Sequence, residues 1–122
     1  MAEYQIEAVI EYVFRMGGAE QPGFPSIVGS RENAVILHYD TNRRPMEAGD
    51  LVVMDIGAEY RGYSADVTRT LPVSGTFTPE QRAIYEIVLE AQEAGIAASR
   101  AATLITYTAA KGSLKPDFDT AC

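Results

Sequence analysis

Apolar residues recur at helical spacing near the start of the chain. The stripe consists of Ile6, Val9, Ile10, Val13 and Phe14, and charged residues occupy the positions between them. An apolar stripe with a period of about 3.6 residues is typical of an amphipathic helix. We therefore expect a helix over Glu3 to Met16 that packs this stripe on the core and ends at the glycine pair 17–18.

Shorter apolar runs, bounded by turn residues, predict strands. We expect these strands at Ser26–Gly29, Ala34–Tyr39, Leu51–Glu59 and Tyr63–Leu71. The last two form the arms of a hairpin joined near Tyr60–Arg61–Gly62, because glycine adopts a positive φ without steric cost.

A second helix is predicted by its start signal. Thr78 is suited to the N-cap, Pro79 to the first turn and Gln81 to a capping box, and the helix extends to about Ser99. Its expected buried side consists of Ile84, Ile87, Val88, Ala91 and Ile96.

The order helix, strands, helix predicts an α+β fold with its helices against one face of an antiparallel sheet. Residues 101–122 follow no clear pattern, so we divide the chain into a domain at 1–100 and a divergent tail.

Composition excludes some classes of partner. The 122 residues contain 17 acidic and 10 basic side chains, a formal charge of −7, whereas nucleic acids and anionic membranes attract basic surfaces. The N-terminus lacks the pattern of a secretory signal, and no apolar stretch is long enough to span a bilayer. Cys122 is the one cysteine, so no intrachain disulfide can form. We expect a soluble cytoplasmic protein.

Two aspartates are candidates for chemistry in the predicted hairpin. If the hairpin folds about Tyr60–Arg61, Asp55 and Asp66 face each other directly on one side of the sheet. Like charges at such a distance repel and call for a cation between them. That cation is either an arginine, from position 61 or 69, or one or two divalent metal ions. Alternatively, Asp55 anchors a turn. Spacing alone leaves these alternatives open.

His38 is the one histidine of the chain. A lone histidine in a strand is usually a packing residue, but its pKa range also suits a proton donor or a group that binds a substrate carbonyl.

Several motifs together resemble a known family. They are FPSIV, NAVILHY, GDLVVMD, GAEYRGYSADVTRT and TPEQRAIYE, within about Gly23 to Ile96. This run resembles the catalytic domain of Xaa-Pro aminopeptidases, is close to prolidases, and is more distantly similar to methionine aminopeptidases. ADVTRT has the form found in the proline-specific branch. The resemblance implies the first half of a pita-bread fold and cleavage of the bond between an N-terminal residue and proline.

The resemblance also implies roles for the candidate residues. Asp55 matches an aspartate that chelates one metal ion, and Asp66 matches an aspartate that bridges two. His38 matches a histidine that contacts the substrate and stabilises the reacting carbonyl. The implied cofactors are two divalent ions, with Mn²⁺ first and Co²⁺ or Zn²⁺ as alternatives. The implied partner is a peptide with proline in its second position.

The family's remaining metal ligands, a histidine and two glutamates, belong to the second half of its domain, and no histidine follows His38. We therefore expect a truncated chain that binds metal weakly or not at all and is inactive alone. A further copy or another chain could complete it, so we expect a homo-oligomer or a hetero-association. The alternative is a non-catalytic module that binds peptides or proteins.

Overall fold

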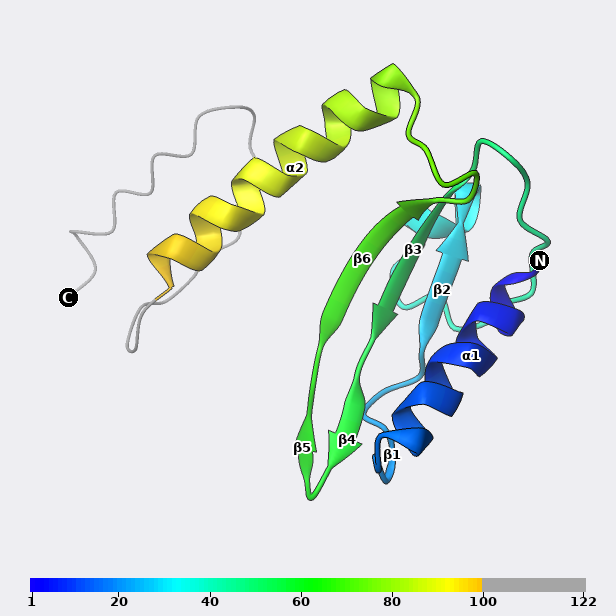
Figure 1. Ribbon diagram of the computed structural model, residues 1–122, viewed down its shortest axis with the longest axis vertical. Helices are drawn as coiled ribbons and strands as arrows, with labels where there is room; N and C mark the ends of the chain where they lie inside the picture. Colours follow the sequence, from blue (N-terminus) through cyan, green and yellow to red (C-terminus); the bar gives the residue numbers. More distant parts are fainter. Residues whose placement is uncertain (100–122) are drawn as a thin grey trace. The chain divides into compact units, whose positions relative to one another are not determined.

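The computed structural model describes residues 1–99, which belong to two units. The first unit comprises Met1–Thr78, and the second begins at Pro79. The first unit contains helix α1 (Glu3–Met16), the 3₁₀ helix η1 (Arg31–Val35) and six strands, and the second contains helix α2 (Pro79–Ala98) (Figure 1). The strands are β1 (Gln21–Pro22), β2 (Ile27–Ser30), β3 (Leu51–Ile56), β4 (Ala58–Tyr60), β5 (Tyr63–Ser64) and β6 (Val67–Pro72).

Two small antiparallel sheets share one long hairpin. One sheet has the order β2-β3-β6 and the other the order β1-β4-β5. β3 leads into β4 and β5 leads into β6, so the hairpin runs through both sheets (Figure 1). α1 packs against β1 and β2. The α+β prediction is thus confirmed, as are the two hairpin arms and the strand near residues 26–29.

The hairpin turn corrects the predicted register. Tyr60 pairs with Tyr63, and the loop residues Arg61 and Gly62 have φ values of 52° and 81°. Positive φ at both loop positions is the signature of a type I′ turn, whose twist matches that of the strands. Asp55 consequently pairs with Thr68, and the predicted direct pairing with Asp66 is wrong by two positions.

The predicted strand at Ala34–Tyr39 is also wrong. The chain instead forms η1 and an irregular segment, and the side chains of Val35 and Leu37 are 84% and 89% exposed. The outer edge of β2 bonds to side chains in place of another strand. The backbone N–H of Val28 donates to Asn42 Oδ1 (2.9 Å), and that of Ser30 donates to Glu3 Oε1 (2.8 Å).

Both predicted helices are confirmed, but their expected buried faces are only partly so. In α1, Ile6, Ile10 and Phe14 are half-buried, whereas Val9 and Val13 are exposed. α2 buries no residue within its own unit. No helix among residues 1–99 is long and apolar enough to cross a lipid bilayer.

The interior of the first unit is unusually polar. Its buried apolar residues are Ala2, Val28 and Val52, and its buried polar residues are Glu3, Ser26, Ser30, Asn42 and Asp50. Within residues 1–99, every buried side-chain nitrogen or oxygen has a hydrogen-bond partner. Because an unsatisfied buried polar group costs about 1–3 kcal/mol, removing a partner from this network would destabilise the fold.

Gly57 permits the close approach of the two hairpin arms between the sheets. A Cβ atom at this position would lie 1.8 Å from the backbone oxygen of Ala65. The contact is with backbone, which cannot rotate away as a flexible side chain could.

We expect Gly57→Ala to lower the free energy of unfolding by at least about 2 kcal/mol, because the added methyl group must push the arms apart. Denaturant unfolding followed by circular dichroism measures this change. Gly17→Ala is the matched control, since its Cβ would make an ordinary contact of 3.4 Å, and it should shift stability by less than about 0.5 kcal/mol. Equal effects of the two substitutions would contradict the role of Gly57.

Candidate functional site

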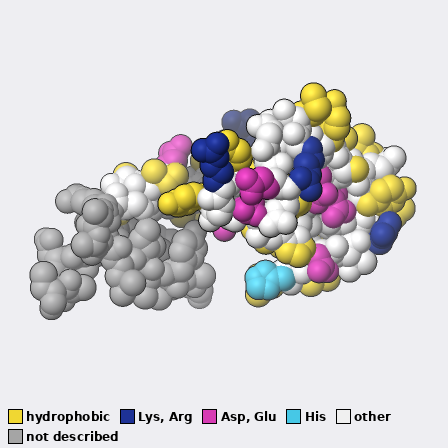
Figure 2. Space-filling view, turned by 90° about the horizontal axis from the view of Figure 1, so that it is seen from below, with side chains coloured by type: hydrophobic (Ala, Val, Ile, Leu, Met, Phe, Trp, Pro, Cys, Tyr) yellow, Lys and Arg dark blue, Asp and Glu magenta, His cyan; other side chains and the backbone are white. Residues whose placement is uncertain are grey.

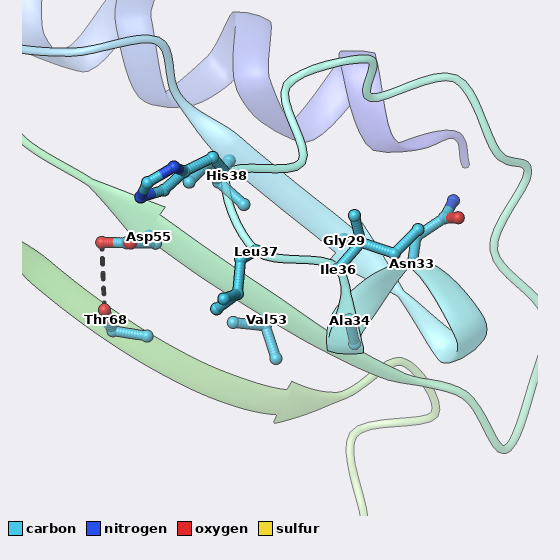
Figure 3. A pocket seen from close by; sticks show the side chains of 10 residues that line it. Gly29, Asn33, Ala34, Ile36, Leu37, His38, Val53, Asp55 and Thr68 are labelled. Atoms are coloured by element: carbon cyan, nitrogen blue, oxygen red, sulfur yellow. Dashed lines mark hydrogen bonds between the residues drawn. The ribbon is translucent and has the colours of Figure 1, made fainter.

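A pocket of about 210 Å³ lies where the segment after η1 passes over the sheet β2-β3-β6. Its apolar lining includes Ile27 of β2, Val53 of β3 and Leu37 of the segment, and its polar lining includes His38, Asp55 and Thr68. Figure 3 shows the imidazole of His38 and the carboxylate of Asp55 at the same end of this pocket. The structure therefore brings two of the three predicted site residues together.

Asp55 is fixed by the strand opposite it. Its Oδ1 accepts a hydrogen bond of 3.0 Å from Thr68 Oγ1, drawn as the dashed line in Figure 3. Because a carboxylate has about four lone-pair sites, this bond leaves most of its acceptor capacity for another ligand. Asp55 lies inside β3, so it does not anchor a turn.

The arginines proposed to bridge the aspartates have other contacts. The Arg61 guanidinium lies 5.2 Å from the centre of the Tyr60 ring, and Arg69 donates to the backbone oxygen of Thr68. Among residues 1–99, neither Asp55 nor Asp66 takes part in an ion pair. Within the described residues, neither arginine therefore bridges the two aspartates.

Asp66 lies between β5 and β6, two positions before Thr68, and is exposed. It is not among the residues that line the pocket. The β3–β6 ladder pairs Asp55 with Thr68 and ends at the pair Ile56–Val67, so Asp66 lies just outside the ladder and is not the direct partner of Asp55.

His38 lies on an irregular segment rather than in a strand, with a φ of 53°. Its side chain is exposed, and the single histidine is visible in cyan on the surface in Figure 2. A positive φ is uncommon outside glycine, and such residues persist only where surrounding contacts determine them. The conformation of His38 therefore depends on what holds its segment.

A buried carboxylate that the sequence did not reveal holds this segment. Glu3 Oε1 accepts from the backbone and hydroxyl of Ser30 (2.8 and 2.7 Å), and Oε2 accepts from Tyr39 Oη and the Arg44 backbone (both 2.8 Å). Burial by itself would raise the pKa of Glu3, but these hydrogen bonds together lower it below its usual range. The pKa of Tyr39 is raised by burial and by its bond to Glu3. An acidic residue in the first turn of a helix is common, so nothing in the sequence distinguished Glu3.

A largely buried ion pair lies next to the hydrogen bonds of Glu3. Arg44 Nη1 is 2.6 Å from Asp50 Oδ2, and the two side chains are 15% and 7% exposed. Asp50 also accepts from the backbone N–H of Glu47 (2.9 Å), and these two bonds lower its pKa. Neither Arg44 nor Asp50 was singled out by the sequence analysis.

The donor set is suited to a divalent metal but is incomplete. Carboxylate oxygens with an imidazole nearby suit Mn²⁺ and similar ions. Among residues 1–99, no group of three or more histidine, cysteine, aspartate or glutamate side chains could hold a metal ion. Asp55 and Asp66 alone therefore do not make up a coordination sphere, and a metal ion bound there would require further ligands.

Comparison with known proteins identifies the family. The profile of metallopeptidase family M24 matches residues 1–111, nearly the whole sequence. The chain belongs to metallopeptidase family M24. This finding confirms the resemblance seen in the motifs.

Individual M24 proteins are similar to the chain in both sequence and structure. It is 50% identical over 105 residues to the Xaa-Pro aminopeptidase of Escherichia coli, covering 86% of this chain and 24% of that protein. It is 43% identical over 98 residues to the Xaa-Pro dipeptidase of Pyrococcus furiosus, covering 80% of this chain and 28% of that one. A variant of E. coli aminopeptidase P in complex with substrate superposes with a TM-score of 0.80 at 50% identity, over 82% of this chain and 23% of that one.

These matches confirm that the chain has part of the pita-bread fold. The chain spans about a quarter of the length of the relatives that it matches. The predicted boundary at residue 100 and the tail 101–122 lie at and beyond the edge of the described residues, and they stay predictions.

The lowered pKa values of Glu3 and Asp50 predict acid sensitivity. A carboxylate whose pKa is lower in the folded state stabilises the fold above its unfolded pKa, and this contribution is lost as the pH falls through the folded value. The free energy of unfolding should therefore decrease from about pH 5 downward. Urea unfolding at pH 6 and pH 3.5 measures the decrease, which should be smaller in Glu3→Gln. The same decrease in both proteins would show that Glu3 does not contribute.

Proposed function

We propose that this chain supplies part of the active site of a metal-dependent aminopeptidase that hydrolyses the bond between an N-terminal residue and proline. The observation that carries the proposal is the pocket that His38 and Asp55 share, in an M24 chain 50% identical to an Xaa-Pro aminopeptidase. Apolar side chains line most of the pocket, and His38, Asp55 and Thr68 are among its polar groups.

The spacing of the three candidate residues supports their assignment. His38 precedes Asp55 by 17 positions, and Asp66 follows Asp55 by 11. Solved structures of E. coli aminopeptidase P include single variants in which a histidine or one of two aspartates is replaced by alanine, and those three positions have the same intervals. Experimenters thus chose for substitution three residues of the same types at the same spacing.

Each residue has a role that fits its position. Asp55, held by Thr68, would bind a metal ion with the acceptor capacity that this bond leaves free. Asp66, exposed and directly before β6, would contribute its carboxylate to a second ion. Divalent ions bound there would supply Lewis-acid activation of the peptide carbonyl and of the attacking water. His38 would donate a hydrogen bond to the carbonyl oxygen as negative charge develops.

The cofactor proposal is two divalent ions, with Mn²⁺ first and Co²⁺ or Zn²⁺ as alternatives. E. coli aminopeptidase P has been solved in a zinc-substituted form with product, so that relative accommodates zinc. The remaining ligands, a histidine and two glutamates by resemblance to the family, would come from a longer polypeptide or from a second chain. The cytoplasmic location stays a prediction.

A chimera tests the proposal without requiring the 122 residues to act alone. The matched segment of E. coli Xaa-Pro aminopeptidase is replaced by the corresponding residues of this chain, and release of the N-terminal residue from a short Xaa-Pro peptide is measured with Mn²⁺. We expect the chimera to be active and its Asp55→Asn variant to lose measurable activity, because a metal ligand is removed. His38→Ala should reduce kcat by about 10²–10³-fold.

Asp40→Asn is the matched control, because it makes the same change at an exposed aspartate that does not line the pocket. A folded chimera without activity, or equal losses in Asp40→Asn and Asp55→Asn, would refute the proposal. Peptide binding by the 122-residue chain that survives Asp55→Asn would instead identify the alternative, a non-catalytic binding module.

We also propose that the 122-residue chain associates with a further copy of itself. The apolar residues of α2, among them Ile87 and Val88, are 66% and 62% exposed, and α2 buries none of its residues within its own unit. Large exposed apolar surfaces are characteristic of interaction sites.

Light scattering should therefore give a mass above the 13.3 kDa of one chain at working concentration. Ile87→Lys should shift the mass toward the monomer, whereas Gln92→Lys, with the same added charge at a polar position, should not. A monodisperse monomer for the unmodified chain would contradict the proposed association.

A further inference from the structure

The segment that carries His38 requires external support. Between Arg31 and Arg44, η1 is the only regular element, and Arg31, His38 and Asn42 all have positive φ values of 52°, 53° and 48°. Such conformations are sparsely populated for residues other than glycine. A segment of this kind keeps one conformation only if contacts from outside it hold several of its points.

Glu3 contacts this segment and its flanks at several points. Its carboxylate accepts from Ser30 just before the segment, from Asn33 Nδ2 (3.2 Å) near its start, from Tyr39 Oη in its middle and from the Arg44 backbone at its end. The Glu3 backbone N–H also donates to the Arg44 oxygen (3.1 Å). Glu3 is 0% exposed, so water does not compete for these bonds.

Asn42 supplies a second attachment near the end of the segment. Its side-chain oxygen accepts from the Val28 N–H (2.9 Å), and its side-chain nitrogen donates to the Ser26 oxygen (2.7 Å). These two side-chain bonds take the place of the backbone bonds that a neighbouring strand would make at the outer edge of β2. The segment is thus attached to β2 near one end and to helix α1 through Glu3 at several points.

We propose that Glu3 is a positioning residue, whose buried carboxylate holds the segment so that His38 faces Asp55 across the pocket. Tyr39 directly follows His38, and its hydroxyl donates to Glu3 Oε2, so the carboxylate fixes the backbone next to the imidazole. Glu3 lies far from the other site residues in sequence and does not line the pocket. That Glu3 positions His38 is inferred from these contacts and does not require the proposed function. The meaning of this placement for catalysis does rest on the proposed function.

The negative, acceptor-only character of the side chain is essential. Backbone N–H donors lie at both carboxylate oxygens, from Ser30 at Oε1 and from Arg44 at Oε2. A glutamine has one acceptor oxygen and one NH₂ donor group. Whichever way the amide turns, its NH₂ group faces an N–H donor, and the segment must move away.

The chain's single histidine makes a specific test possible. In the 122-residue chain, the NMR signal of the His38 imidazole is recorded for Glu3→Gln well below that variant's melting temperature. We expect the signal to shift and broaden, and the amides of Ser30 and Arg44 to exchange at least about tenfold faster. The amides of the β3–β6 ladder should keep their protection. These readouts are independent of peptidase activity, so failure here and failure of the proposed function are distinguishable.

Glu11→Gln is the matched control, since Glu11 lies on the same helix and accepts from Ser26 Oγ (3.2 Å) without touching the segment. A lower melting temperature of Glu3→Gln with an unmoved His38 signal would overturn the proposal, as would an equal shift in Glu11→Gln. If Glu3→Gln does not fold, Tyr39→Phe decides, because it removes one donor to Glu3 and keeps the ring. Faster exchange at the Arg44 amide in that variant supports the proposal, and unchanged exchange overturns it.

Discussion

The buried carboxylate of Glu3 makes the interaction on which the arrangement of α1, β2 and the irregular segment depends. It stands at the start of α1, and its hydrogen bonds reach β2 through Ser30 and the irregular segment through Tyr39 and Arg44. A buried charge is tolerated only when it is fully hydrogen-bonded, and here each oxygen has several donors. The helix, the edge strand and the segment are therefore tied to one point.

The candidate site therefore consists of two parts whose geometry is determined in different ways. The aspartates belong to a hairpin whose geometry is set locally, by the type I′ turn at Arg61–Gly62 and by the close approach at Gly57. The histidine belongs to a segment without strand pairing, whose geometry is set by side chains distant in sequence. Strands hold metal ligands precisely, whereas a loop supported by a polar network can place a group that acts on substrate.

Errors of prediction fell where a residue's environment was decided at long range. Ala34–Tyr39 has the composition of a strand, yet side chains of Glu3 and Asn42 already satisfy the edge to which it would have paired. The register error arose because Gly62 allowed more than one turn, and the structure forms the loop whose twist matches the arms. Both helices were predicted correctly, since their spacing and end signals are local in sequence.

The sequence by itself determined the helices, the hairpin and, through its motifs, membership in metallopeptidase family M24 with His38, Asp55 and Asp66 as candidates. Those features depend on residues close together in the chain or on a pattern shared with relatives. Only the tertiary structure decided that Asp55 faces Thr68 and that His38 lines the same pocket as Asp55. It also decided that Glu3 is buried and bonded to the segment that carries His38. The physical reason is that burial and hydrogen-bond partners come from segments up to 41 positions apart, and no local pattern encodes which of them meet.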